Sequence, residues 1–159
     1  MAPEASRLRL PRGYPTPAAD APVLDWGRAR ARLEQASTYW LATADSTGRP
    51  HVAPLWGVWV EDALYFDGFS SARWARNLAS NPAASLHLES GTDVVIVDGQ
   101  VDDVVPPPAV AVLVVDAWRR KYGRLLPEPA RGIYRLTPHG ARGWTSFPDD
   151  VTRWTFTDG

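Results

Sequence analysis

Short apolar runs alternate with clusters of turn-forming residues through most of the chain, a pattern that predicts a mainly β protein. Tyr39 to Ala44 is the first run and ends in turn residues, so it opens a hairpin. His51 to Val60 follows with apolar residues on both faces, and we expect both faces to be covered. Further strands are predicted at Ala63 to Asp67, Ala83 to Glu89, Val94 to Val104, Gly132 to Trp144 and Thr152 to Phe156.

Three helices interrupt these strands. Apolar residues at helical spacing predict the first over Trp26 to Gln35, covering one end of a barrel. The second is short and ends at Asn81, because the residue before a proline avoids the helical region. The third lies between Pro106 and Gly123, where prolines before the helix, cations in its last turn and the final glycine outweigh the strand preference of its valines.

With 159 residues, 45% of them hydrophobic, the chain has enough apolar material for one compact domain. Met1 to Pro22 is rich in alanine, proline and charge and lacks the apolar core of a signal peptide. We therefore expect a loose arm over residues 1–23 and a single domain over residues 24–159. The longest apolar run, Ala109 to Val115, is too short to cross a bilayer, which favours a cytoplasmic protein with no membrane partner.

Composition excludes several function classes. A formal net charge of −1 gives no general attraction for nucleic acid or an anionic membrane. The absence of cysteine excludes disulfides, thiolate catalysis and cysteine-ligated zinc. His51, His87 and His139 lack metal-ligand spacing. Neither a nucleophile elbow nor a Gly-x-Gly-x-x-Gly motif follows a strand, which argues against hydrolysis and Rossmann-type nicotinamide binding.

Pro54 stands in the middle of the second predicted strand. A proline has no N–H for the strand ladder, so it marks an edge or an opening where something other than a strand lies alongside. A flat ligand suits that place. The competing interpretation is a kinked edge strand with Trp56 in the core.

The second helix and the loop before it form the other candidate site. Ser71 is a plausible N-cap, and Arg73, Arg76, Asn77 and Ser80 fall on one helical face. A helix start with serines and an arginine suits a phosphate, although a solvated basic surface explains the same spacing. Beside an open strand, such a turn would bind the phosphate of a flavin-like nucleotide whose ring lies on the strand.

Eight tryptophans suggest a rival class, a β module that binds sugar or nucleic acid on an aromatic platform. Most of them lie in apolar or periodic segments, where core or interface packing is expected. These are Trp26, Trp40, Trp59, Trp118 and Trp144.

Six segments recur in a characteristic order between about Leu24 and Phe156. They are Tyr39 to Thr43, Gly48 to Trp56, Ala63 to Phe66, Arg73 to Leu78 with Asn81-Pro82, Val95 to Gly99, and Thr152 to Phe156. This ordered set resembles the pyridoxamine 5'-phosphate oxidase-like superfamily of flavin-binding split barrels, especially the branch that uses FMN or the deazaflavin coenzyme factor 420.

The resemblance implies a six-stranded antiparallel split barrel, forming a homodimer with two cofactor sites at the subunit interface. The cofactor ring would lie along Ala53, Pro54, Leu55 and Trp56, with Phe66 and Asp67 nearby. The phosphate would be held by Ser71, Arg73 and Asn77. Asp93 and Val94 of the other subunit would complete the site, and Arg153 and Trp154 would close over it.

The resemblance further implies an oxidoreductase that transfers a hydride between FMN or factor 420 and a small unsaturated or heteroaromatic substrate, with no catalytic side chain. A flavin, deazaflavin or haem carrier or sensor of the same fold is the alternative, and the tryptophan platform is the third interpretation. Many relatives carry Lys or Arg directly after the arginine matching Arg73, where this chain has Trp74. The lost charge-assisted contact, commonly about 1.5 to 3 kcal/mol, favours the deazaflavin over FMN.

Overall fold

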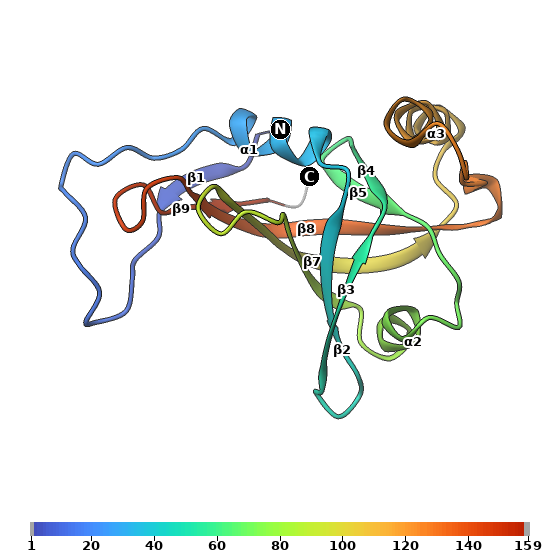
Figure 1. Ribbon diagram of the computed structural model, residues 1–159, viewed down its shortest axis with the longest axis horizontal. Coiled ribbons are helices and arrows are strands. Elements are labelled where there is room, and N and C mark those ends of the chain that lie inside the picture. The colour runs from blue at the N-terminus through green and yellow to red at the C-terminus, as the bar shows by residue number, and fades with distance from the viewer. Residues whose placement is uncertain (1, 158–159) are drawn as a thin grey trace.

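The barrel is built around one strand that bends at Trp56 (Figure 1). Its first half, β3 (Pro50–Leu55), pairs with β2 (Tyr39–Ala44), and its second half, β4 (Gly57–Val60), pairs with β5 (Ala63–Phe66). In the computed structural model, which describes residues 2–157, the circuit then closes through antiparallel pairing of successive strands. These are β5 with β8 (Ile133–Trp144), β8 with β7 (Val94–Val104), β7 with β6 (Ala83–His87), and β6 with β2.

Six strand positions thus form the circuit, which confirms the predicted mainly β split barrel. The sheet nevertheless has nine strands, because the bent strand counts twice and two more strands extend it. One is β9 (Thr152–Thr155), which pairs with the C-terminal part of β8.

The other added strand lies in the N-terminal segment, which is predicted as an arm. Residues Glu4–Arg7 form β1, which pairs antiparallel with β9. Further along, the Leu24 N–H donates to Thr152 Oγ1 at 2.9 Å, and Trp154 Nε1 donates to the Leu24 carbonyl at 3.3 Å. The first and last parts of the chain therefore hold each other against the barrel. The predicted arm begins at residue 1 and the predicted domain ends at residue 159. Residue 1 and residues 158–159 lie outside the described residues.

The three predicted helices are present. α1 (Trp26–Gln35) and α3 (Pro108–Tyr122) both contact β4, whereas α2 (Arg73–Ser80) lies beside β2 and β3 (Figure 1). Gly123 ends α3 in the left-handed region at φ 68°, the conformation that favours glycine. A short 3-10 helix, Pro129–Arg131, precedes β8. Within residues 2–157, no helix is both long and apolar enough to span a membrane.

The pairing register covers one face of the sheet and leaves the other open. Leu41, Leu86 and Val97 are successive cross-strand neighbours, and each is fully buried. The prediction that both faces of His51 to Val60 are covered is correct for β4 but wrong for β3, where Val52 is 50% exposed. The same face stays open on β2, where Ala42, the cross-strand neighbour of Val52, is half-buried.

Most tryptophans belong to the core, which counts against the aromatic platform. Trp26, Trp59 and Trp118 are buried as predicted, whereas Trp40 and Trp144 are only half-buried. Two further tryptophans that lie in the candidate site motifs are also buried. These are Trp74 and Trp154.

Candidate functional site

The edge of β3 and the helix α2 belong to neighbouring elements of the barrel, because α2 contacts both β2 and β3. Pro54 faces Trp40 of β2 in the pairing register, and in the described part of the chain no strand pairs with the other edge of β3. The side chain of Pro54 is exposed, that of Ala53 is half-buried against the core, and Leu55 is buried. α2 packs beside this edge (Figure 1). The fold therefore brings together the two features that the sequence indicated separately.

The start of α2 carries no side-chain cap. Ala72 takes the N-cap position, so the prediction of Ser71 as the cap is wrong. The reason is a turn in which the Ala72 N–H donates to the Phe69 carbonyl at 2.9 Å, which delays the helix by one residue. Ser71 itself is exposed, and its carbonyl accepts a hydrogen bond from the Arg76 guanidinium. Arg76 thereby holds the loop in place.

Arg73 is the cation left free at this helix start. Its side chain is exposed and makes no ion pair with any residue between 2 and 157. The backbone N–H groups in the first turn of a helix have no partner within the helix, and they favour an anion. Together with an uncommitted guanidinium and the nearby serine hydroxyls, they are a donor set that fits a phosphate.

Trp74 points into the core beneath this loop. It is 9% exposed, and its ring packs edge-on against Phe66 and Tyr134 with centroids 5.5 and 4.9 Å away. A Cβ built at Gly68 would lie 2.7 Å from Trp74 Cζ2, so the loop passes directly over the indole. Position 74 of this chain is therefore part of the core and offers no charge to a phosphate.

Three other predicted site residues lie in or next to this loop and helix. Asn77 is 5% exposed and donates from Nδ2 to Thr43 Oγ1 at 3.0 Å, so its placement on the exposed face with Arg73 is wrong. This hydrogen bond ties α2 to β2. Phe66 is fully buried, and Asp67 beside it is exposed, accepting the Gly68 N–H at 2.8 Å.

Trp56 stands at the bend of the barrel strand and is half-buried. Its ring stacks on that of Tyr122 with centroids 4.5 Å apart, and the Arg124 guanidinium lies 5.5 Å from the Trp56 ring centre. The Tyr122 hydroxyl accepts the Gly57 N–H at 3.0 Å, and burial raises the pKa of Tyr122. The end of α3 is therefore fixed to the bend, which the sequence motifs did not indicate.

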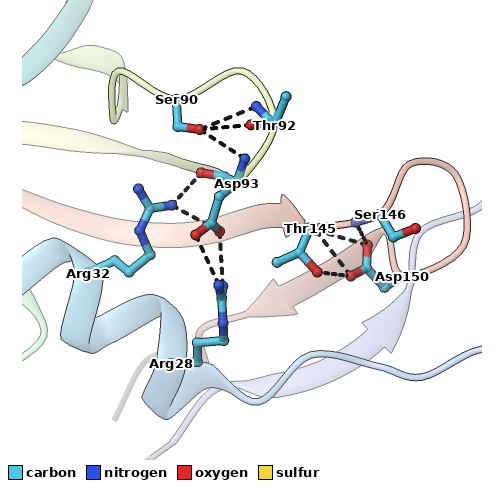
Figure 2. Close-up of polar contacts among 8 residues, drawn as sticks. All are labelled: Arg28, Arg32, Ser90, Thr92, Asp93, Thr145, Ser146 and Asp150. Carbon is cyan, nitrogen blue, oxygen red and sulfur yellow. Dashed lines mark hydrogen bonds and ion pairs between the residues drawn. The ribbon is translucent and has the colours of Figure 1, made fainter.

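Asp93 is held within its own chain by two arginines (Figure 2). Arg28 makes a bidentate contact with both carboxylate oxygens at 2.9 Å, and Arg32 lies 3.0 Å from Oδ1. The hydrogen bond from Arg28 lowers the pKa of Asp93 against the opposing effect of burial. Val94, which follows it, is buried. The ion pairs of Asp93 with Arg28 and Arg32 therefore link α1 to the start of β7.

The other group in Figure 2 fixes the loop between β8 and β9. Asp150 is buried and accepts the backbone N–H groups of Thr145 and Ser146 at 2.8 to 3.1 Å, together with the Thr145 hydroxyl. Burial alone would raise the pKa of Asp150, but these hydrogen bonds outweigh it and lower the pKa. The loop leading to Arg153 is thereby well ordered.

Arg153 and Trp154 point to opposite sides of β9. Trp154 is 1% exposed, with its ring 5.5 Å from that of Trp26, so its predicted closure over the site is wrong for this chain. Arg153 is exposed and lies in the same cross-strand row as Pro54, five strand spacings away along the sheet. The two residues therefore lie on the same face of the sheet.

The histidines remain scattered in the fold. His87 stacks on Trp40 with ring centroids 6.4 Å apart, and its Nδ1 lies 2.8 Å from the Leu88 carbonyl. Over the described range, residues 2–157, no three His, Cys, Asp or Glu side chains gather in a way that could hold a metal ion.

A separate cleft of about 600 Å³ lies between α1, β4 and α3. It contains Lys121 and Arg120, which sequence reasoning treated only as cations at the end of a helix. The signal that could have drawn attention to Lys121 is its rarity, since the chain has no other lysine.

Taken together, the bent barrel strand and the closed circuit of antiparallel strands define a split-barrel protein. The family model of pyridoxamine 5'-phosphate oxidase matches residues 26–145. The chain therefore belongs to the pyridoxamine 5'-phosphate oxidase family.

Solved structures of similar fold have diverse roles. A factor 420 reductase is 24% identical with a TM-score of 0.55, over 83% of this chain and 98% of that one. The haem storage protein HutZ from Vibrio cholerae is 23% identical with a TM-score of 0.56, over 71% and 87%. A haem-binding protein from Mycobacterium smegmatis is 19% identical with a TM-score of 0.62, over 80% and 56%. Likeness at this level establishes the fold alone. No curated protein matches the sequence.

Proposed function

We propose that this protein is an FMN- or factor 420-dependent oxidoreductase that transfers a hydride between its cofactor and a small unsaturated or heteroaromatic molecule. The observation that carries the proposal is the open edge of β3 beside the uncapped start of α2, with Arg73 free of ion pairs among the described residues. Membership of the pyridoxamine 5'-phosphate oxidase family and the similar fold of a factor 420 reductase support a redox cofactor.

In this proposal each part of the site has a distinct task. The backbone of Ala53 to Trp56 would bind the edge of the ring, and Ser71 with Arg73 would bind the phosphate. Asn77 and Phe66 would keep the loop in place from beneath. The cofactor, when bound, supplies the hydride chemistry, so the chain has to orient it and exclude water. Trp56, braced by Tyr122, would form an apolar wall next to the ring.

We further propose a homodimer in which a second copy covers the open sheet face. This face is made by cross-strand neighbours that remain half-buried or exposed in the single chain, including apolar side chains typical of interfaces. Arg153 belongs to the same cross-strand row as Pro54 and would contribute to a cofactor site across such an interface. The face comprises Pro54, Val52, Trp40, Ala42, His87, Ile96 and Trp144. We expect the protein to act in the cytoplasm without nucleic-acid or membrane partners.

The second candidate is a carrier or sensor that binds flavin, deazaflavin or haem without turnover. It is favoured by the similar folds of HutZ, a haem storage protein, and of the mycobacterial haem-binding protein. The two candidates differ in chemistry rather than in fold, so binding and turnover have to be measured separately.

The test is an equilibrium titration of the purified protein with FMN, factor 420 and haem, followed by absorbance and fluorescence. Binding of FMN or factor 420 at micromolar concentration, followed by oxidation of the reduced cofactor by a cyclic enone or a nitroimidazole, supports the oxidoreductase. Binding without turnover of any tested acceptor supports the carrier. Failure of FMN and factor 420 to bind at tens of micromolar contradicts the proposed site.

A further inference from the structure

Lys121 is the only lysine in a chain that contains 17 lysine and arginine residues. Arginine stays charged in proteins, whereas a lysine whose pKa is lowered becomes a neutral, nucleophilic amine. The single position where the chain uses lysine is also unusual in structure, because Lys121 is half-buried in the cleft between α1, β4 and α3.

The hydrogen bonds of Lys121 engage two of the three positions on Nζ beyond its carbon. Nζ donates to the Tyr39 hydroxyl oxygen at 3.0 Å and to the Gly57 carbonyl at 3.3 Å. The Tyr39 hydroxyl donates its own proton to the Leu33 carbonyl, so both partners of Nζ act as acceptors. An amine with two N–H groups satisfied in this way keeps its lone pair free. Within residues 2–157, no carboxylate forms an ion pair with Lys121 to hold it charged.

The surroundings of Lys121 have opposing effects on its charge. Burial lowers the pKa of Lys121 to about 8, outweighing the attraction of the Glu34 carboxylate. Glu34 itself is engaged by Arg30 at 2.8 Å. The rings of Tyr39 and Tyr122 lie 5.2 and 5.9 Å from Nζ. The remaining charged groups lining the cleft are Glu61, from the turn after β4, and Arg120 of α3.

Arg120 indicates what kind of molecule the cleft would take. It is exposed and adjacent to Lys121, and it has no ion pair with the residues that the structure describes. Val58, Leu113 and Ala117 give the cleft an apolar lining. A volume of about 600 Å³ accommodates a small metabolite.

We propose that Lys121 is a reactive amine that captures a small carbonyl compound bearing a carboxylate, as an imine, in the cleft between α1, β4 and α3. The Nζ lone pair attacks the carbonyl carbon, and a proton passes from nitrogen to the former carbonyl oxygen to give a carbinolamine. Loss of that oxygen as water forms the C=N bond, with no oxidation or reduction. Arg120 binds the carboxylate. Lys121 contacts Tyr39 and Gly57 next to the end of β3, but the proposal does not depend on the proposed cofactor.

The first test compares Lys121 with a free amine in the same tube. The native protein and Nα-acetyl-lysine methylamide are incubated with glyoxylate and cyanoborohydride, which reduces the imine to a stable secondary amine, and peptide mass spectrometry separates Lys121 from the chain's α-amino group. At pH 7 we expect Lys121 to react at least about tenfold faster than the model amine, because a larger fraction of it is neutral. An equal or slower rate overturns the proposal.

The second test examines the anion preference. Labelling by glyoxylate is compared with labelling by propanal, an uncharged aldehyde, in wild type, Arg120→Ala and Arg119→Ala. Arg119 is the matched control, because it is exposed and paired with Asp116 at 2.8 Å outside the cleft. We expect the glyoxylate-to-propanal ratio to fall several-fold in Arg120→Ala alone. An unchanged ratio, or an equal fall in both variants, overturns the assignment of the cleft to carboxylates.

Discussion

The ring of Trp56 lies flat on the ring of Tyr122, with their planes only 5° apart. The contact joins the bend of the barrel strand to the end of α3, two segments that are distant in sequence. It is reinforced by the Tyr122 hydroxyl, which bridges the Gly57 N–H and the carbonyls of Ser37 and Gly57 at 2.9 to 3.0 Å. The wall proposed beside the cofactor ring is therefore part of the barrel's own closure.

Tyr122→Phe should lower the free energy of unfolding by about 1 to 2 kcal/mol, because the stack persists while the Gly57 N–H loses its partner. Denaturant unfolding followed by fluorescence measures this change. Tyr14→Phe is the control, since Tyr14 is 53% exposed and should change stability little. If Tyr122→Phe and wild type were equally stable, the Tyr122 hydroxyl would not contribute to holding α3 against the bent strand.

Gly68→Ala should disturb the loop before α2, because the added Cβ would lie 2.7 Å from the buried Trp74 ring. We expect weaker cofactor binding and a loss of stability of about 1 to 3 kcal/mol from overpacking. Gly91→Ala is the matched control, since a Cβ there has no atom within 4 Å. If the two substitutions had indistinguishable effects, that would contradict the close packing of Gly68 against the Trp74 ring.

Asp93→Asn tests the ion pairs formed with Arg28 and Arg32. The ion pairs lower the pKa of Asp93 in the folded state, so their stabilisation is present above the ordinary carboxylate pKa and is lost as the pH falls through the lowered value. Because the groups are partly exposed, we expect a difference of at most about 1 kcal/mol near neutrality. Unfolding curves across pH should show this difference shrinking in acid. A difference that grows in acid would contradict this account.

The proposed dimer is tested by a charge on the open sheet face. Val52→Asp should shift the protein towards monomer in sedimentation, because a buried, unpaired carboxylate would oppose the interface. Val23→Asp is the control, as Val23 is 45% exposed in the single chain, close to the 50% of Val52, but lies outside the sheet. A wild-type protein that sediments as a monomer, or a Val52→Asp dimer as tight as wild type, would contradict the interface.

Local patterns were sufficient to predict much of the fold. α1 and β7 have the predicted bounds, and the prolines, cations and Gly123 around α3 correctly outweighed its valines. The split barrel itself was implied by the resemblance of the ordered motifs to the pyridoxamine 5'-phosphate oxidase-like superfamily. Pro54 was informative because a missing N–H is a property of the residue itself.

The remaining features depend on long-range pairing. The bend at Trp56 arises because β3 pairs with β2 whereas β4 pairs with β5. No residue pattern within the strand predicts that change of partner. β1 required a partner at the opposite end of the chain. Asn77 was assigned to the wrong environment because helical spacing gives relative positions and not how far the buried side of a helix extends. Lys121 was overlooked because helix-end cations usually remain in solvent.

The central claim is that a phosphate-bearing redox cofactor binds where Arg73 stands free beside the β3 edge. The most direct measurement is the dissociation constant of the better-binding cofactor, FMN or factor 420, for wild type, Arg73→Ala and Arg131→Ala. Arg131 is the control because its side chain is 82% exposed and remote in sequence from the loop. We predict binding about ten- to a hundredfold weaker for Arg73→Ala, as expected for a lost charge-assisted contact, and unchanged for Arg131→Ala. Equal binding by all three proteins would contradict the account.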